Sequence, residues 1–400
     1  MKRNIELLAP AGDLERLKYA VVYGADAVYI GGKEFSLRAN ASLFTREEIR
    51  EGVSFAHEKG VRVYVTVNVY PDEEDFQGLD DYLLFLDDAQ VDAIIVSSLA
   101  ILLRAKQLQV HYELHVSTQC SISNTESALF WKKLGANRVV LARECPLKEI
   151  SQIRRASGME IEIFLHGGMC SSFSGRCSLS DYMANRNANR GGCAHSCRWD
   201  YTLSSRDDVS LSDAPVIFAS YDLCGLPLLP EILKTGVCSL KIEGRMKSVH
   251  YLATLLLVYR SALRDCAQSK ELFAKNLPFY LEELKKAENR PAATGFFKSR
   301  DDGALLEHIN DEMAIQNYIG QVTSTKEKET TILVRNHFEM PLRVEILSPT
   351  GKRVETIEKM YNEYGEEFLV ANPGQVLHFT SSLPISEYAL LRKESMDEKN

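Results

Sequence analysis

Four cysteines stand close together near the middle of the chain, in a stretch rich in glycine, serine, arginine and asparagine. Six residues separate Cys170 from Cys177, three separate Cys193 from Cys197, and 15 residues lie between the two pairs. Such polar surroundings make a poor hydrophobic core, which is where an isolated cysteine is usually found. Clustered thiolates are typical ligands of zinc or of an iron–sulfur cluster. The spacing therefore predicts a metal centre and leaves both metals open.

A disulfide framework is the competing interpretation of these cysteines. The N-terminal residues MKRNIELLAPAG run directly into a predicted strand, without an apolar export signal. We therefore expect a cytoplasmic protein, and thiols stay reduced in that compartment. Reduced, clustered thiols favour metal binding. Three other cysteines stand among apolar residues and are interpreted as core residues, whereas Cys120 is less certain because it follows a polar run; the three are Cys145, Cys238 and Cys266.

Length and composition limit the class of protein. A chain of 400 residues with 45% hydrophobic content can bury a large core, which favours one large domain and a smaller one. The net charge of −8 argues against nonspecific binding of polyanions over the whole surface, but it leaves a local basic patch open. No apolar run approaches the roughly 18 residues of a membrane span. We expect no membrane association.

A strand-then-helix pattern recurs through the first two-thirds of the chain. It predicts an α/β fold, a (β/α)₈ TIM-like barrel with a cysteine-rich insertion after the seventh strand. An open doubly wound sheet competes, but no GxGxxG fingerprint follows the first strand. Thr45 with Glu48 forms a predicted capping box, and Ser248 is placed to cap the last helix. The predicted strands are 5–9, 27–30, 62–69, 93–96, 113–117, 138–141, 160–165 and 239–242, and the predicted helices are 14–22, 45–60, 79–86, 98–108, 125–134, 147–156, 226–233 and 249–265.

Polar residues follow several of these strands, at the end of the barrel where such folds gather function. Lys241, Arg245 and Lys247 follow one strand and could grip a carboxylate or a phosphate, with Arg38 as a further candidate. A solvated ion-pair network is the alternative interpretation of these charges. The polar residues at strand ends also include Asn68, Ser117, Gln119 and Glu144, and the candidate catalytic residues are His166, Arg143, Lys241, Glu243 and Arg245.

The last part of the chain changes to short β runs separated by turns, as in Pro349-Thr350-Gly351 and Asn372-Pro373-Gly374. These runs, at 320–324, 331–334, 342–347, 354–357 and 375–379, predict a small all-β barrel without a catalytic constellation. An RNA-binding or docking module and a purely stabilising domain both stay open. The predicted domains are a barrel at 1–275 containing a cysteine loop at 166–200, a linker at 276–318 and a β-barrel domain at 319–393.

Several motifs together resemble a known family. Glu162-x-Phe164, Gly167, Cys170, Gly175-x-Cys177 and Ser180 are similar to the signature of the collagenase-like peptidases, unassigned-peptidase family thirty-two. The segments ELLAPAG, GADAVYIGG and SLKIEGRMKS resemble that family as well, so the resemblance covers nearly the whole chain. The segment GGCAHSCRWDY narrows it to a tRNA-hydroxylating branch, and the C-terminal domain resembles a translation-factor barrel.

This resemblance implies prephenate-dependent hydroxylation of the wobble uridine of certain tRNAs to 5-hydroxyuridine. It also implies a 4Fe-4S cluster bound by all four loop cysteines. Other branches of the family draw one ligand from elsewhere, so Cys224 is a candidate substitute for one of the four. Arg143, Lys241 or Arg245 would hold the two carboxylates of prephenate, the small dicarboxylate co-substrate. The implied macromolecular partner is tRNA, and an electron donor or a paralogous subunit stays open. The implied cluster ligands are Cys170, Cys177, Cys193 and Cys197.

Two other functions compete. The family name implies a peptidase, yet the chain contains neither the GxSxG of serine hydrolases nor the HExxH of zincins. A zinc-stapled, non-catalytic tRNA-binding protein would use the same cysteines structurally. Its basic and aromatic residues, which could meet phosphates and stack on bases, are Arg176, Arg186, Arg190, Arg198, Trp199 and Tyr201.

Overall fold

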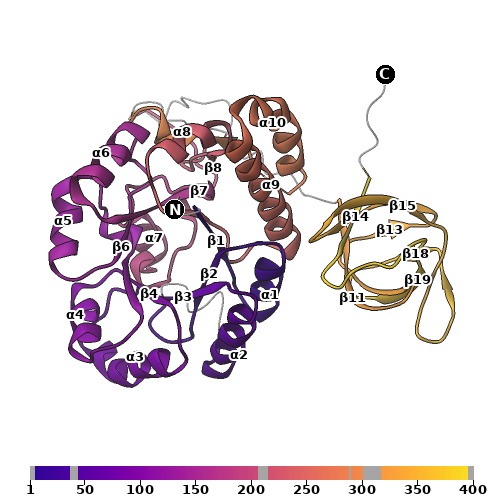
Figure 1. Cartoon of the computed structure of the whole chain (residues 1–400), viewed down its shortest axis with the longest axis horizontal. Helices are drawn as coiled ribbons and strands as arrows, with labels where there is room; N and C mark the ends of the chain where they lie inside the picture. The colour runs from indigo at the N-terminus through magenta and orange to yellow at the C-terminus, as the bar shows by residue number, and fades with distance from the viewer. Residues whose placement is uncertain (1–4, 37–43, 206–214, 288–289, 301–316, 395–400) are drawn as a thin grey trace.

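A (β/α)₈ barrel forms the larger part of the computed structural model, which describes residues 5–36, 44–205, 215–287, 290–300 and 317–394. Arg38 lies outside the described residues. Eight parallel strands pair in chain order, and the last closes the ring by pairing with both the first and the seventh (Figure 1). The predicted barrel is thereby confirmed. Its strands are β1 (Glu6–Pro10), β2 (Ala27–Gly31), β3 (Arg62–Val67), β4 (Ala93–Val96), β5 (Glu113–Val116), β6 (Arg138–Val140), β7 (Glu160–Gly167) and β9 (Ser239–Ile242).

The barrel helices lie outside these strands and bury one apolar face each, as amphipathic helices do. The predicted caps are present: Thr45 and Glu48 form a reciprocal capping box, and the Ser248 side chain accepts a hydrogen bond from the amide of Tyr251. The helices are α1 (Leu14–Val22), α2 (Arg46–His57), α3 (Leu79–Asp88), α4 (Leu99–Gln107), α5 (Thr125–Lys133), α6 (Leu147–Ser157), α8 (Leu229–Lys234) and α9 (Val249–Gln268).

The barrel interior contains a chain of alternating charges, which we call the ionic column: Glu6, Arg138, Glu162 and Lys241. Arg138 donates to Glu6 at 2.7 Å and to Glu162 at 3.2 Å, and Lys241 donates to the other oxygen of Glu162 at 3.0 Å. All four side chains are buried. Buried charges are tolerated only when they are paired, so the alternation of sign is what makes this interior stable.

A β-bulge in β7 changes the direction of the side chains that follow it. The pairing of β7 with β9 shifts between Phe164, which lies opposite Lys241, and His166, which lies opposite Ile242. One extra residue in a strand breaks the alternation of inward and outward side chains. His166 therefore shares the outward face with Ile242, and its ring packs against Tyr259 of α9.

Two elements lie outside the regular strand–helix alternation of the barrel. β8 (Asp222–Cys224) pairs antiparallel with the end of β7 and parallel with β10 (Ala292–Ala293). α10 (Lys270–Lys285) follows α9 and packs against it. The predicted boundary between barrel and linker, at 275/276, falls inside α10. Between β7 and β8 the cysteine loop carries the one-turn helix α7 (Leu179–Ala184) and the 3₁₀ helices η3 (Ala188–Arg190) and η4 (Ser196–Arg198).

The C-terminal domain is an antiparallel β structure with its own apolar core. It is built mainly from a sheet with strand order β15-β14-β20-β11-β12-β19-β16-β17, and the small pair β13-β18 lies beside it. The predicted all-β domain is confirmed. Its strands are β11 (Tyr318–Lys326), β12 (Glu329–Val334), β13 (Phe338–Glu339), β14 (Leu342–Ser348), β15 (Gly351–Ile357), β16 (Met360–Tyr361), β17 (Glu367–Phe368), β18 (Val370–Ala371), β19 (Val376–Thr380) and β20 (Leu390–Lys393).

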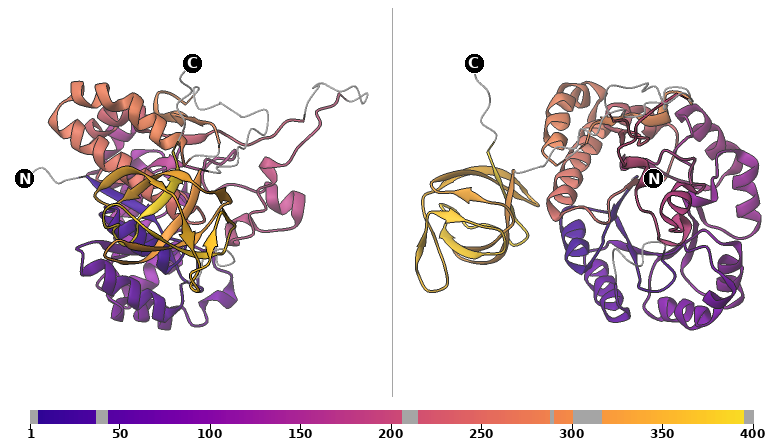
Figure 2. Two further views of the ribbon diagram at one scale, coloured as in Figure 1. Left: turned by 90° about the vertical axis from the view of Figure 1, so that its right-hand side faces the viewer. Right: turned by 180° about the vertical axis from the view of Figure 1, so that it is seen from behind.

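The β domain lies beside the barrel (Figure 2), and the two domains meet through buried polar contacts. Arg392 donates at 2.5 Å to Glu345 within the β domain and at 2.5 Å to Glu283 on α10. Lys352 bridges the same two carboxylates at 3.0 and 2.7 Å. Burial alone would raise the pKa of Glu283, but Arg392 and the lysines outweigh it and lower the pKa to about 2. The interface therefore depends on Glu283 being ionised.

Arg392→Met should lower the free energy of unfolding by about 3 kcal/mol, because it leaves two buried carboxylates short of a cation. Urea denaturation at neutral pH measures this. The matched control is Lys285→Ala, whose exposed pair with Glu282 on α10 should be worth less than about 0.5 kcal/mol. Equal denaturation midpoints for the two variants would contradict the assignment.

The same interface should weaken in acid. Because the pKa of Glu283 is lowered from 4.5 to about 2 on folding, its contribution is complete above pH 4.5 and is lost as the pH falls toward about 2. The stability difference between wild type and Arg392→Met should therefore shrink over this pH range. Denaturation series at several pH values check this, and a difference that stays constant would refute the role of Glu283.

Candidate functional site

A cavity of about 230 Å³ lies at the mouth of the barrel, between the carboxyl ends of the strands and the cysteine loop. Most of the predicted site residues meet here, from both ends of the chain's barrel domain. Asn68, Ser117 and Gln119 also contribute to its wall. The predicted cation, acid and cysteine positions that line it are Arg143, Lys241, Glu243, Arg245, Cys170, Cys177, Cys193 and Cys197.

Lys241 forms part of the cavity floor as the upper end of the ionic column. Its ammonium group lies 4.2 Å from the centre of the Tyr29 ring and donates to Glu162. Burial lowers the pKa of Lys241, and the charge of Glu162 offsets this only in part. Burial would raise the pKa of Glu162, but Lys241 and Arg138 lower it to about 2. Glu162 is therefore ionised at neutral pH and holds the lysine in place.

Arg143 and Arg245 are the other two cations of the cavity. The guanidinium carbon of Arg143 lies 3.8 Å from the centre of the Phe164 ring, and its buried Nε atom has no hydrogen-bond partner among the residues that the structure describes. Arg245 is buried and donates to Ser36 and Thr66 at 3.4 and 3.3 Å. A Cβ at position 31 would lie 2.1 Å from Nη1 of Arg245, so any residue other than Gly31 would displace the guanidinium from this position.

Of the two remaining candidate catalytic residues, Glu243 lines the cavity and His166 does not. The Glu243 carboxylate accepts a hydrogen bond of 3.3 Å from the amide of Gly168, at the start of the cysteine loop. His166 does not line the cavity: it is buried, and its Nδ1 lies 3.0 Å from the hydroxyl of Tyr259. The structure therefore does not bring His166 to the candidate catalytic residues. Lys247 also lies outside the cavity wall, over the ring of Tyr251.

Three contacts hold the cysteine loop against the barrel. The buried Glu144 carboxylate accepts hydrogen bonds from the amide and the hydroxyl of Ser174, at 3.0 and 2.9 Å. Gly175 has a φ of +76° and passes so close to Gln119 that a Cβ would lie 2.0 Å from its carbonyl oxygen. Arg190 pairs with Asp75 at 2.6 Å. The charge of Arg190 is therefore offset within the protein by Asp75.

The four loop cysteines are thiols and not disulfides, and they line one cavity, two of them exposed and two partly buried. Burial raises the pKa of Cys197, and the nearby Cys170 and Cys193 sulfurs raise it further, against the charge of Arg198. Within the described part of the chain, no three His, Cys, Asp or Glu side chains converge closely enough to hold a single metal ion. The donor set thus fits a thiolate-bound group, but its ligands are not gathered around one point.

The remaining cysteines are placed elsewhere. Cys145 and Cys224 are buried, and Cys224, the predicted substitute ligand, lies on β8 and outside the cavity wall. Cys120 donates to the carbonyl oxygen of Ser97, and burial raises its pKa to about 12. Cys238 and Cys266 are partly buried.

Sequence reasoning missed several residues of the cavity wall. Tyr29, Thr66 and Phe164 lie on the strands and point inward; the period-2 alternation of each strand could have identified them. No sequence pattern identifies Ser174, because its role depends on the contact with Glu144 that only the structure shows.

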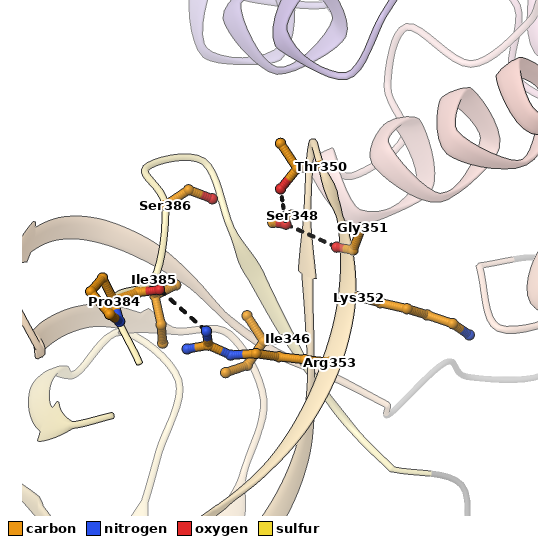
Figure 3. Close-up of a pocket in the computed structure, with 9 residues that line it drawn as sticks. All are labelled: Ile346, Ser348, Thr350, Gly351, Lys352, Arg353, Pro384, Ile385 and Ser386. Atoms are coloured by element: carbon orange, nitrogen blue, oxygen red, sulfur yellow. Dashed lines mark hydrogen bonds between the residues drawn. The ribbon is translucent and has the colours of Figure 1, made fainter. Parts of the chain in front are cut away.

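A second cavity, of about 270 Å³, lies in the β domain (Figure 3). Its two cations are already engaged: Lys352 pairs with Glu283 and Glu345, and Arg353 donates to the carbonyl oxygens of Leu383 and Pro384. Ser348 and Thr350 bond to one another at 3.2 Å. This cavity therefore offers little charge to a ligand.

Among the described residues, no helix is both long and apolar enough to cross a membrane.

The chain matches two protein-family models, one over each of its domains. The model of peptidase family U32 matches residues 12–306, and that of the peptidase family U32 C-terminal domain matches residues 315–392. The tRNA hydroxylation protein P1 of Bacillus subtilis is 42% identical over 97% of this chain and 94% of its own length. The tRNA hydroxylation protein P of Escherichia coli is 32% identical over 98% and 97%. A collagenase of Porphyromonas gingivalis is 34% identical over 65% and 66%.

Ser174→Ala should loosen the cysteine loop, because Glu144 then keeps only one of its hydrogen-bond donors in the loop. A hydrogen bond to a charged group is worth about 1.5–3 kcal/mol, so the loop should open roughly tenfold or more often. The rate of tryptic cleavage after Arg176 and Arg186 measures this. Ser178→Ala, at an exposed serine of the same loop, is the control, and equal cleavage rates in the two variants would exclude the anchoring role.

Proposed function

Since the chain belongs to peptidase family U32 and matches tRNA hydroxylation proteins along nearly its whole length, we propose that it hydroxylates tRNA. The proposed reaction is the prephenate-dependent conversion of the wobble uridine to 5-hydroxyuridine. One observation supports it above the others: a single cavity combines four cysteine thiols with three cationic side chains. That combination suits a metal cofactor beside a small dianionic co-substrate.

The proposed cofactor is a 4Fe-4S cluster on Cys170, Cys177, Cys193 and Cys197. When bound, such a cluster supplies electron-transfer chemistry. Each thiolate binds a different iron atom of the cluster, so the ligands stand farther apart than the four ligands of one zinc ion. Four cysteine thiols that line one cavity suit such a cluster.

The proposed co-substrate, prephenate, carries two carboxylates. Arg143 and Arg245 are its proposed binding residues, because guanidinium groups bind carboxylates through paired hydrogen bonds. The unpartnered Nε atom of Arg143 is a buried donor that a carboxylate would satisfy. Lys241 adds positive charge to the floor, while Glu162 fixes its position.

The family description names peptidases, but we favour hydroxylation over proteolysis. The match to the collagenase covers 65% of this chain, whereas the matches to the two tRNA hydroxylation proteins cover 97% and 98%. Thiolates engaged as metal ligands are also not free to act as nucleophiles.

Cys193→Ser should abolish both the cluster and the activity. We expect anaerobically purified wild type to carry iron and acid-labile sulfide and to restore 5-hydroxyuridine in tRNA from a deletion strain. The variant should have lost most of its iron and all hydroxylation. Metal analysis and nucleoside mass spectrometry measure the two effects, with Cys266→Ser, outside the cavity, as the control. Stoichiometric zinc in place of iron would overturn the cofactor assignment.

Arg143→Gln should raise the KM for prephenate about tenfold to a hundredfold, because it removes a charged hydrogen-bond donor from the carboxylate. The kcat should change much less, since the residue binds the co-substrate and the RNA still docks. Initial rates of hydroxylation at varied prephenate concentration measure this. Arg155→Gln, on the exposed face of α6, should behave as wild type. An unchanged KM would remove Arg143 from the binding site.

A further inference from the structure

The outer surface of the cysteine loop carries large apolar side chains in contact with solvent. Tyr182 is 88% exposed, and Phe173, Met183 and Trp199 are each about two-fifths exposed, at 40%, 38% and 41%. Soluble proteins seldom gather exposed aromatic side chains on one short segment unless the segment binds a partner. We call these four residues the outer face of the cysteine loop. Figure 2 (left) shows the segment around α7, in pink, projecting from one end of the barrel.

The outer face is continuous with the wall of the cavity. On α7, Leu179 and Ser180 line the cavity, and Tyr182 and Met183 follow Leu179 by three and four residues. Residues at these spacings share one face of a helix. The apolar side of α7 therefore begins at the cavity and extends outward by one turn. Trp199 follows η4 directly, and α7 packs against η4, which places Trp199 in the same part of the loop.

The charge of the loop favours a polyanion. Residues 166–200 contain four arginines and two aspartates, whereas the whole chain has a net charge of −8. Arg190 is held by Asp75, but Arg176 and Arg186 are exposed, and within the described residues neither has an ion-pair partner closer than 4 Å. Exposed aromatic rings beside unpaired arginines are the combination with which proteins bind single-stranded nucleic acid, through base stacking and phosphate contacts.

We propose that the outer face of the cysteine loop binds unpaired nucleotides of an RNA loop, with Tyr182 as the main stacking residue. This inference rests on the proposed function and names the surface that would deliver the substrate. A base must leave its stack to reach an enzyme cavity. Stacking of neighbouring bases on aromatic side chains beside the cavity offsets the stacking energy that is lost when the target base leaves the RNA stack. Paired bases present no free ring face to Tyr182, so the surface selects unpaired loops over duplexes.

The test compares the binding of two RNA probes to the full-length, cluster-loaded protein. One probe is an anticodon stem-loop, and the other is a fully paired duplex of the same length. Tyr182→Ala should weaken binding of the stem-loop roughly tenfold and leave binding of the duplex unchanged. Tyr182→Phe keeps the ring and should bind as wild type. Tyr364→Ala, at an 80% exposed tyrosine of the β domain, is the matched control and should change neither affinity.

Arg186→Gln tests the electrostatic part separately. It should weaken binding of both probes. The slope of log affinity against log salt concentration should fall by about the contribution of one phosphate contact. Unchanged stem-loop binding in Tyr182→Ala, or an equal loss for stem-loop and duplex, would overturn the stacking proposal. If Tyr182→Ala hydroxylates tRNA like wild type, the proposed function stands and this inference fails. If wild type neither binds nor hydroxylates tRNA, both fail together.

Discussion

The pairing of Lys241 with Glu162 inside the barrel is the interaction on which the rest of the site depends. A TIM barrel is usually filled by apolar side chains, but here Glu6, Arg138, Glu162 and Lys241 alternate in charge toward the mouth. Each charge is neutralised by its neighbours, and loss of Glu162 would take from Lys241 the carboxylate to which it donates in a medium of low polarity. The column ends in an ammonium group of fixed position. The cavity thereby has a cationic floor that is set by the barrel and not by a mobile loop.

The extra residue in β7 has a second organising effect. Because the bulge turns His166 toward α9, the strand can end at Gly167 and release the chain over the mouth of the barrel. The Glu243 carboxylate then accepts a hydrogen bond from the amide of Gly168, and Ser174 donates to Glu144, which follows the neighbouring strand β6. The cysteine loop is consequently attached at several points around the rim, which keeps its thiols and the three cations in one space.

Much of the architecture could be predicted from the sequence, because local signals determine it. Apolar runs located the eight barrel strands, and the capping residues Thr45 and Ser248 located two helix starts. The four cysteines and the cations after the strands also came to one cavity, since parallel strands of a barrel end at the same rim. What the sequence did not show depends on tertiary contacts. The bulge that displaces His166, the short strand β8 and the pairing of Arg190 with Asp75 leave no periodic pattern in the sequence. Tyr182 was missed because exposure is not visible in a run of letters.

The buried contacts between the barrel and the β domain have a consequence for how the protein can meet a large substrate. Tyr23 of the barrel domain donates to the backbone of Leu347 and Tyr388, His250 stacks on Tyr318 at 5.0 Å, and the apolar core of the barrel continues into the β domain. Contacts of this kind oppose movement of the β domain relative to the barrel. The surface of the β domain is thereby kept at a nearly constant distance from the cavity. A molecule that touches both must match that spacing in its own shape, so the protein can reject a chemically correct group presented by a molecule of the wrong dimensions.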